Sequence, residues 1–223
     1  MTEPIPRSAA QPTAGGLRQR SKARKLENIR RTARELFVER GYDATTTRAI
    51  AKRAGIGLGT LFTYAADKRD LLFLIFNDEL IELATQAFAR ENSAPIFVDR
   101  LVMVFHDFYA YFVRQPNLAR FLLRELTFYT YGPEARRFQE HRDQIVAGVA
   151  ALVKRARTDG LVASAEDDMT VARAIFDIYT AEIRRWLADD SRMPNLAQGL
   201  ATLRRMLQLL VEGLRPFAAG RLD

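Results

Sequence analysis

The chain has 223 residues, of which 48% are hydrophobic and 27% are charged, a composition typical of a globular protein with a substantial core. It contains no cysteine, which excludes thiolate catalysis, disulfide bonds and cysteine-ligated metal sites. The two histidines, His106 and His141, are far apart in the sequence, so a histidine metal site is not expected. No stretch approaches the roughly 18 consecutive apolar residues of a membrane span, and no secretory signal is recognisable. We therefore expect no membrane partner and a cytoplasmic location.

The net charge of +7 is distributed unevenly along the chain. Residues 1–68 hold 14 basic and 6 acidic residues, a net charge of +8, whereas residues 69–223 have a net charge of −1. A localised positive field favours a polyanionic partner, either nucleic acid or an anionic membrane surface. A solvated basic tail is the alternative interpretation, because the cations between Arg18 and Lys25 supply much of the excess.

The first 17 residues are rich in proline and glycine and show no periodicity, which predicts a disordered basic arm that we extend to residue 19. A helix is expected from about Ser21 to Glu39, because apolar residues recur there at intervals of three and four. This stripe consists of Leu26, Ile29, Ala33, Leu36 and Phe37. Gly41 follows as the expected helix stop.

Two short helices joined by a glycine-containing turn are expected next. The first is capped within Thr45–Thr47 and runs through Lys52, and the second runs from Leu58 to Ala65. Ala51 is small enough to let the two helices cross closely, and Gly55 suits a turn that needs a positive φ. The apolar residues expected to fix the crossing are Ile50, Ile56 and Leu61. In a basic region, this pattern favours a DNA-binding helix-turn-helix.

Longer helices are expected to fill the rest of the chain. Asp67 is the expected N-cap of a helix that runs to about Arg90. The other predicted helices cover about Pro95–Arg114, Asn117–Tyr129, Pro133–Thr158, Glu166–Ala188 and Pro194–Leu214. Prolines fall between these segments, and no run alternates with the period of a strand. We therefore predict an all-α fold, in which a three-helix N-terminal domain with the helix-turn-helix precedes a larger helical domain.

The helix-turn-helix region resembles the tetracycline-repressor (TetR) family. The resemblance rests on the run TTRAIAKRAGIGLGTLFTYA at residues 46–65 and on DKRDLL at residues 67–72. The preceding Ala33, Leu36, Phe37, Gly41 and Tyr42 are similar to the same family's first helix and loop. The family resemblance implies a DNA-binding domain in residues 20–67. It also implies that residues 68–223 bind an effector and form a dimer through two helices per subunit.

The resemblance also implies which residues contact DNA. Thr47, Thr60, Tyr64 and Lys68 match positions that touch the phosphate backbone in the family. Arg48 opens the second helix and is expected within reach of guanine O6 and N7. The third helix offers Gly57, Leu58, Phe62 and Thr63, which favour readout of thymine methyl groups and DNA shape. Alternatively, Phe62 and Tyr64 are core aromatics and Lys68 is a solvated helix residue.

The aromatic residues of the larger domain have two interpretations. They either fill an ordinary core or line a mostly apolar ligand pocket with a few polar groups. The candidate pocket residues are Phe105, Tyr109, Phe112, Phe128, Tyr129, Tyr179 and Glu182. Glu182 is unusual because it lies on an apolar helical stripe, where a carboxylate must be paired, protonated or solvated. It is expected to anchor a ligand, to pair with an arginine across a subunit interface, or to lie at a wet edge.

We therefore expect a homodimeric transcriptional regulator, most simply a repressor, that binds a palindromic double-stranded DNA operator and is released by a small, mostly apolar effector. One short reading helix contacts too few bases for useful specificity, so two copies are expected to read one operator. No cofactor is expected. The rival interpretations are an architectural, effector-independent DNA-binding protein and a helical enzyme with a basic flank. The enzyme is disfavoured, since the sequence shows no paired catalytic carboxylates, nucleophile–base set or phosphate loop.

Overall fold

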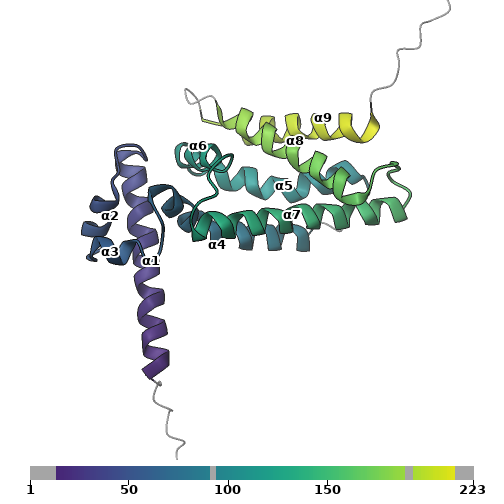
Figure 1. Cartoon of the computed structure of the whole chain (residues 1–223). Helices are drawn as coiled ribbons and strands as arrows, with labels where there is room; N and C mark the ends of the chain where they lie inside the picture. The colour runs from purple at the N-terminus through teal and green to yellow at the C-terminus, as the bar shows by residue number, and fades with distance from the viewer. Residues whose placement is uncertain (1–13, 91–93, 189–192, 214–223) are drawn as a thin grey trace, which may run out of the picture. The chain divides into compact units, whose positions relative to one another are not determined.

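The computed structural model describes residues 14–90, 94–188 and 193–213 and contains only helices and their connections there. This confirms the predicted all-α fold. The chain divides into two compact units, one ending at Tyr64 and the other beginning at Ala65 (Figure 1). None of the described helices is long and apolar enough to cross a membrane.

The first unit consists of α1 (Ala14–Arg40), α2 (Thr47–Arg53) and α3 (Leu58–Leu61). The predicted apolar stripe of α1 is buried from Ile29 onward, which includes Ala33, Leu36 and Phe37. Ile50 and Ala51 of α2 and Leu61 of α3 are buried as well. The buried Thr45 hydroxyl donates to the carbonyls of Leu36 and Gly41, at 3.0 and 2.8 Å, and fixes the loop after α1. One long and two short helices therefore share one small core.

Both ends of the predicted three-helix unit need correction. The first helix begins at Ala14, seven residues before the expected Ser21, so residues 14–19 of the predicted disordered arm are helical. Residues 1–13 of that arm lie outside the described residues. The third helix ends at Leu61 and not at Ala65, because the amides of Thr63 and Tyr64 bond to carbonyls three residues back and close two tight turns.

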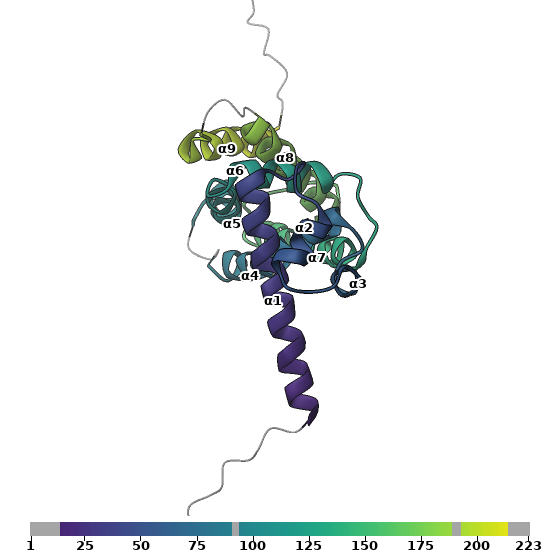
Figure 2. The ribbon, with the colours of Figure 1, turned by 90° about the vertical axis from the view of Figure 1, so that its left-hand side faces the viewer.

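The second unit contains six helices within the described residues. They are α4 (Lys68–Ala89), α5 (Phe97–Phe112), α6 (Pro116–Glu125), α7 (Pro133–Thr158), α8 (Asp168–Ala188) and α9 (Leu196–Glu212). Helix α4 packs against α5 and α7, while α8 packs against α7 and α9. In two perpendicular views, α8 and α9 lie side by side, across α5 and α7 from α4 (Figures 1 and 2). The limits of α7 match the prediction, whereas α6 ends four residues before the expected Tyr129.

A buried carboxylate joins the start of α4 to the start of α7. Asp67 caps α4, as predicted, by accepting from the amides of Arg69 and Asp70. The side chain of Asp70 is fully buried and accepts three backbone N–H bonds: from Ala66 at 2.9 Å, Glu134 at 3.1 Å and Ala135 at 2.9 Å. The two bonds from the first turn of α7 place a negative charge at the positive end of that helix.

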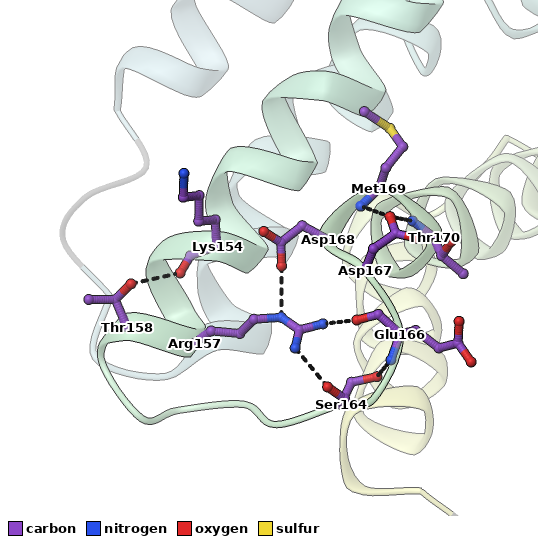
Figure 3. Close-up of polar contacts among 9 residues, drawn as sticks. All are labelled: Lys154, Arg157, Thr158, Ser164, Glu166, Asp167, Asp168, Met169 and Thr170. Atoms are coloured by element: carbon purple, nitrogen blue, oxygen red, sulfur yellow. Dashed lines mark hydrogen bonds and ion pairs between the residues drawn. The ribbon is translucent and has the colours of Figure 1, made fainter.

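The loop between α7 and α8 is organised by a single arginine (Figure 3). Arg157 donates to the carbonyls of Ser164 and Glu166 and forms an ion pair with Asp168, at 2.7 Å from Nε to Oδ1. Asp167 then accepts from the amides of Met169 and Thr170 and caps the start of α8. The predicted start of α8 near Glu166 is therefore two residues early, because Glu166 belongs to the loop.

Candidate DNA-binding surface and ligand cavity

The helix-turn-helix is fixed by an N-cap and by one glycine. The Thr46 hydroxyl accepts from the amide of Ala49 at 3.1 Å and begins α2, as expected of the threonine run. Gly55 has a φ of +68°, and the amide of Ile56 reaches back to the carbonyl of Ala51 at 3.1 Å. A Cβ at Gly55 would meet nothing within 4 Å, so this turn needs glycine for its backbone conformation and not for space.

The predicted DNA-contact residues of the first unit are all accessible to solvent. Arg48, Gly57, Phe62 and Thr63 are exposed, and the half-buried ones are Thr47, Leu58, Thr60 and Tyr64. The interpretation of Phe62 as a core aromatic is wrong, because this side chain is 45% exposed. Lys68 is half-buried and opens α4, so it belongs to the second unit.

Helix α2 carries positive charges that no acidic side chain of the described residues neutralises. Arg53 pairs with Glu39 at 2.7 Å, whereas the exposed Arg48 and Lys52 make no ion pair within the described part of the chain. Gly57 is the N-cap of α3 and provides no side-chain hydrogen bond to its first turn. The first backbone N–H groups of α3 are therefore available to a hydrogen-bond acceptor from another molecule.

The second unit contains a partly open cavity of about 250 Å³. Its wall is drawn from α4 to α8 and is largely apolar, with Leu80, Phe108, Phe112, Leu123, Leu126, Phe138, Ile145, Phe176, Tyr179 and Ile183. Of the predicted pocket residues, this wall contains only Phe112 and Tyr179. Burial raises the pKa of the Tyr179 hydroxyl well above its ordinary value, and nearby Tyr109 adds to the increase. A buried neutral phenol of this kind suits a pocket for an apolar ligand.

The cavity also has polar groups that the sequence analysis did not identify. Arg142, Asp177, Thr180 and Arg184 contribute to its lining. His141 does so too, although it is only 6% exposed, and its Nε2 has no hydrogen-bond partner among the described residues. The spacing of Phe138, His141 and Ile145 along one face of α7 is the signal that was available in the sequence.

Four predicted pocket residues lie elsewhere in the second unit. Phe105 and Tyr109 are fully buried in the core, where Phe105 stacks on Tyr179 with ring centroids 4.2 Å apart. Tyr129 packs on Phe73, with the Arg69 guanidinium 4.6 Å from the centre of its ring. Phe128 is 90% exposed, so its assignment to the pocket is wrong. The aromatic content of this domain thus serves mostly to fill the core.

Glu182 is paired, but not in the way expected. It is 5% exposed and forms an ion pair with Arg185 of the same helix. It lines a separate recess between α8 and α9, together with Trp186, Asn195, Gln198 and Thr202. The proximity of its negative charge adds to burial in raising the pKa of Tyr109. Glu182 is therefore not part of the main cavity.

Comparison with known proteins is consistent with this geometry. Residues 29–75 match the family model described as bacterial regulatory proteins, tetR family. The chain is 27% identical over 160 residues to the transcriptional repressor KstR of Rhodococcus jostii, which covers 72% of this chain and 71% of that protein. It is 22% identical to the fatty acid metabolism regulator protein of Bacillus subtilis, over 87% of this chain and 98% of the relative.

Solved structures extend the similarity over both units. FadR of Thermus thermophilus, a TetR-family repressor in complex with lauroyl-CoA, is 26% identical with a TM-score of 0.66, covering 89% of this chain and 99% of that one. FadR of Bacillus subtilis in complex with stearoyl-CoA has a TM-score of 0.66 at 21% identity, covering 85% and 99%. All of these relatives are named as regulators and none as an enzyme. Residues 29–75 thus carry the DNA-binding domain of the TetR family, and the chain is similar to a TetR-family repressor over most of its length.

Proposed function

We propose that this chain is a repressor that binds operator DNA as a homodimer and is released when an amphipathic ligand, of the class of long-chain acyl-CoA thioesters, occupies the cavity of the second unit. The observation that carries the proposal is the apolar cavity itself, in a chain that aligns along most of its length with regulators bound to lauroyl-CoA and stearoyl-CoA. The apolar wall suits an acyl chain. Arg142 and Arg184 supply cations for an anionic group.

The proposed DNA contacts come from solvent-accessible residues of the first unit and from Lys68 at the start of α4. We assign phosphate contacts to Thr47, Thr60, Tyr64 and Lys68, because hydroxyl and ammonium groups position a protein on the duplex backbone. We assign a base contact to Arg48, which is exposed and free of acidic partners in the described structure. The remaining surface, made of Gly57, Leu58, Phe62 and Thr63, is apolar or methyl-bearing and suits thymine methyl groups.

Dimer formation is assigned to α8 and α9. Helix α9 contains six leucines, of which only Leu203 and Leu207 are buried within one chain; the others are Leu196, Leu200, Leu209 and Leu210. Leu209 and Leu210 are 50% and 38% exposed, which leaves apolar area on this helix for a second copy. Two copies joined here would present two reading helices to one palindrome.

A route from the cavity to the reading helices follows from the hydrogen bonds of Asp70. Helix α7 contributes Phe138, His141, Arg142 and Ile145 to the cavity, and the amides of its first turn hold the Asp70 carboxylate. Asp70 lies in the first turn of α4, which begins four residues after Tyr64 in the chain. A ligand that displaces α7 is therefore expected to change the start of α4 and, through it, the spacing of the two reading helices.

The test is a displacement titration. A duplex selected from randomised DNA by the full chain is bound at low salt, and lauroyl-CoA is added while DNA release is followed by fluorescence anisotropy. The proposal predicts release, which coenzyme A alone does not cause. Tyr64→Phe and Lys68→Ala should weaken binding to every duplex, and Lys68→Ala should lower the salt slope by about one unit. Tight DNA binding that no acyl-CoA changes would instead favour an effector-independent DNA-binding protein.

A further inference from the structure

The N-terminal half of α1 is a basic helix without acidic residues. No aspartate or glutamate occurs from Ala14 to Leu26. Five cations of this segment are exposed, namely Arg18, Arg20, Lys22, Arg24 and Lys25. None of these five cations forms an ion pair with the described residues. The helical conformation of this segment gives its charges fixed positions relative to one another.

The helical register sorts these cations into two faces. At 100° per residue, Arg18, Lys22 and Lys25 fall on one face, at spacings of four and three. The same face continues as Ile29 and Leu36, which are fully buried in the helix-turn-helix core. Arg20 and Arg24 fall on the opposite face. This face of α1 is therefore apolar in the second half of the helix, where it contributes to the core of the first unit, and cationic in the first half.

The cationic face extends beyond the core of the first unit. A helix rises about 1.5 Å per residue, so Arg18 stands about 16 Å along the axis from Ile29. Helix α1 runs well past α2 and α3 in both views (Figures 1 and 2). A shallow groove lies between α1 and the helix-turn-helix turn. Lys25 of the cationic face lines it together with Arg24, Glu27 and Arg31 of α1, and Ala54, Gly55 and Ile56 line its other side.

We propose that Arg18, Lys22 and Lys25, here called the cationic stripe, bind the phosphate backbone of duplex DNA flanking the operator. This proposal rests on the DNA-binding function proposed above. The partner is a polyanion and not a membrane surface, because residues 18–25 contain no large apolar side chain with which an interfacial helix could enter lipid. Contacts to phosphates alone add affinity and salt dependence without adding sequence specificity.

The test compares two double variants on two duplexes. R18Q/K22Q removes two charges of the cationic stripe, and R20Q/R24Q removes the same charge from the opposite face of the same helix. Glutamine is a good helix former, so circular dichroism should show unchanged helicity in both variants. One duplex ends at the selected operator, and the other carries about 10 additional base pairs, roughly one helical turn, at each end. Affinity is measured by anisotropy over a range of salt concentrations.

We expect the wild type and R20Q/R24Q to bind the longer duplex more tightly than the shorter one, whereas R18Q/K22Q loses this preference. On the longer duplex, the salt slope of R18Q/K22Q should fall by about 0.9 for each phosphate that the variant no longer neutralises. The proposed role of the cationic stripe would be refuted if DNA binding weakened equally in both double variants, or if R18Q/K22Q kept the preference for the longer duplex. Either result would leave the proposed operator binding intact. Failure of the wild type to bind either duplex would overturn both proposals.

Discussion

At the scale of single residues, Gly132 and Asp70 depend on each other. Gly132 precedes α7 with φ +103° and ψ 157°, a conformation open essentially to glycine alone. A Cβ there would stand 2.4 Å from Oδ1 of Asp70. The glycine therefore provides both the backbone conformation and the space that lets the buried carboxylate reach the amides of α7. Neither requirement is visible in the sequence, where Gly132 reads as an ordinary loop residue before a proline.

Gly160 supplies the matched control for Gly132, because its φ is also positive, at +71°, but a Cβ would meet nothing within 4 Å. We expect Gly160→Ala to cost about 1 kcal/mol of unfolding free energy, through backbone strain alone. Gly132→Ala should cost at least about 3 kcal/mol, since the clash with Asp70 adds to the strain. Urea denaturation of both variants measures the difference. Equal costs would show that the carboxylate moves aside freely.

Asp167 makes one part of the stability dependent on pH. Hydrogen bonds from Thr170, and from the amide of Met169, lower the pKa of this carboxyl below its ordinary value of 3.8. A lowered pKa means that the charged form stabilises the fold above the unfolded-state pKa. This contribution is lost as the pH falls from about 4 through the folded-state value. Asp167→Asn keeps a capping oxygen but cannot titrate. Its melting temperature should therefore approach that of the wild type as the pH is lowered from 7 to 3. A constant gap would contradict this assignment.

At the scale of helices, the sequence predicts which helices form and in what order better than it predicts the residues at which they begin and end. Periodic apolar stripes and caps such as Thr46 and Asp67 identify each helix of the described ranges, because these signals are local. The start of α1 is not predictable in this way, since a basic glycine-containing segment carries no apolar period. The cavity is predicted poorly for another reason. Whether an aromatic ring such as Phe105 or Phe112 faces a void or another ring depends on the packing of several helices, which one helical wheel does not contain.

The joint between α4 and α7 is expected to depend on the charge of Asp70. Asp70→Asn replaces one acceptor oxygen by an NH₂ group that faces backbone donors, so at least one buried bond is lost. We expect a cost of about 2–4 kcal/mol, because hydrogen bonds to a buried charge are among the stronger ones. Asp78→Asn is the control, since its ion pair with Arg137 is exposed and should contribute less than about 1 kcal/mol. Similar costs for the two variants in chemical denaturation would refute this role of Asp70.

Helix α9 offers a direct test of the proposed dimer. Leu210 is 38% exposed in the single chain, and a glutamate there would place a charge in the proposed interface. Leu210→Glu should sediment as a monomer, or dissociate at a much higher concentration than the wild type. Val38→Glu, at a 60% exposed apolar position of α1, is expected to leave the assembly unchanged. If Leu210→Glu remained as dimeric as the wild type, α9 would not form the interface.

At the scale of the whole molecule, we propose that the first unit binds DNA and the second binds the ligand. The basic first unit holds the reading helices, and the second contains the cavity, so any regulation must be a coupling free energy between two distinct sites. Linkage makes this coupling reciprocal. If lauroyl-CoA weakens operator binding by a given factor, then operator DNA must weaken lauroyl-CoA binding by the same factor.

The measurement that tests this most directly is the dissociation constant of lauroyl-CoA for the full chain, determined by calorimetry with and without saturating operator duplex. We predict weaker ligand binding in the presence of the duplex, by the same factor with which the ligand weakens DNA binding in the reverse titration. A ligand affinity that the duplex leaves unchanged would contradict the proposed repressor mechanism.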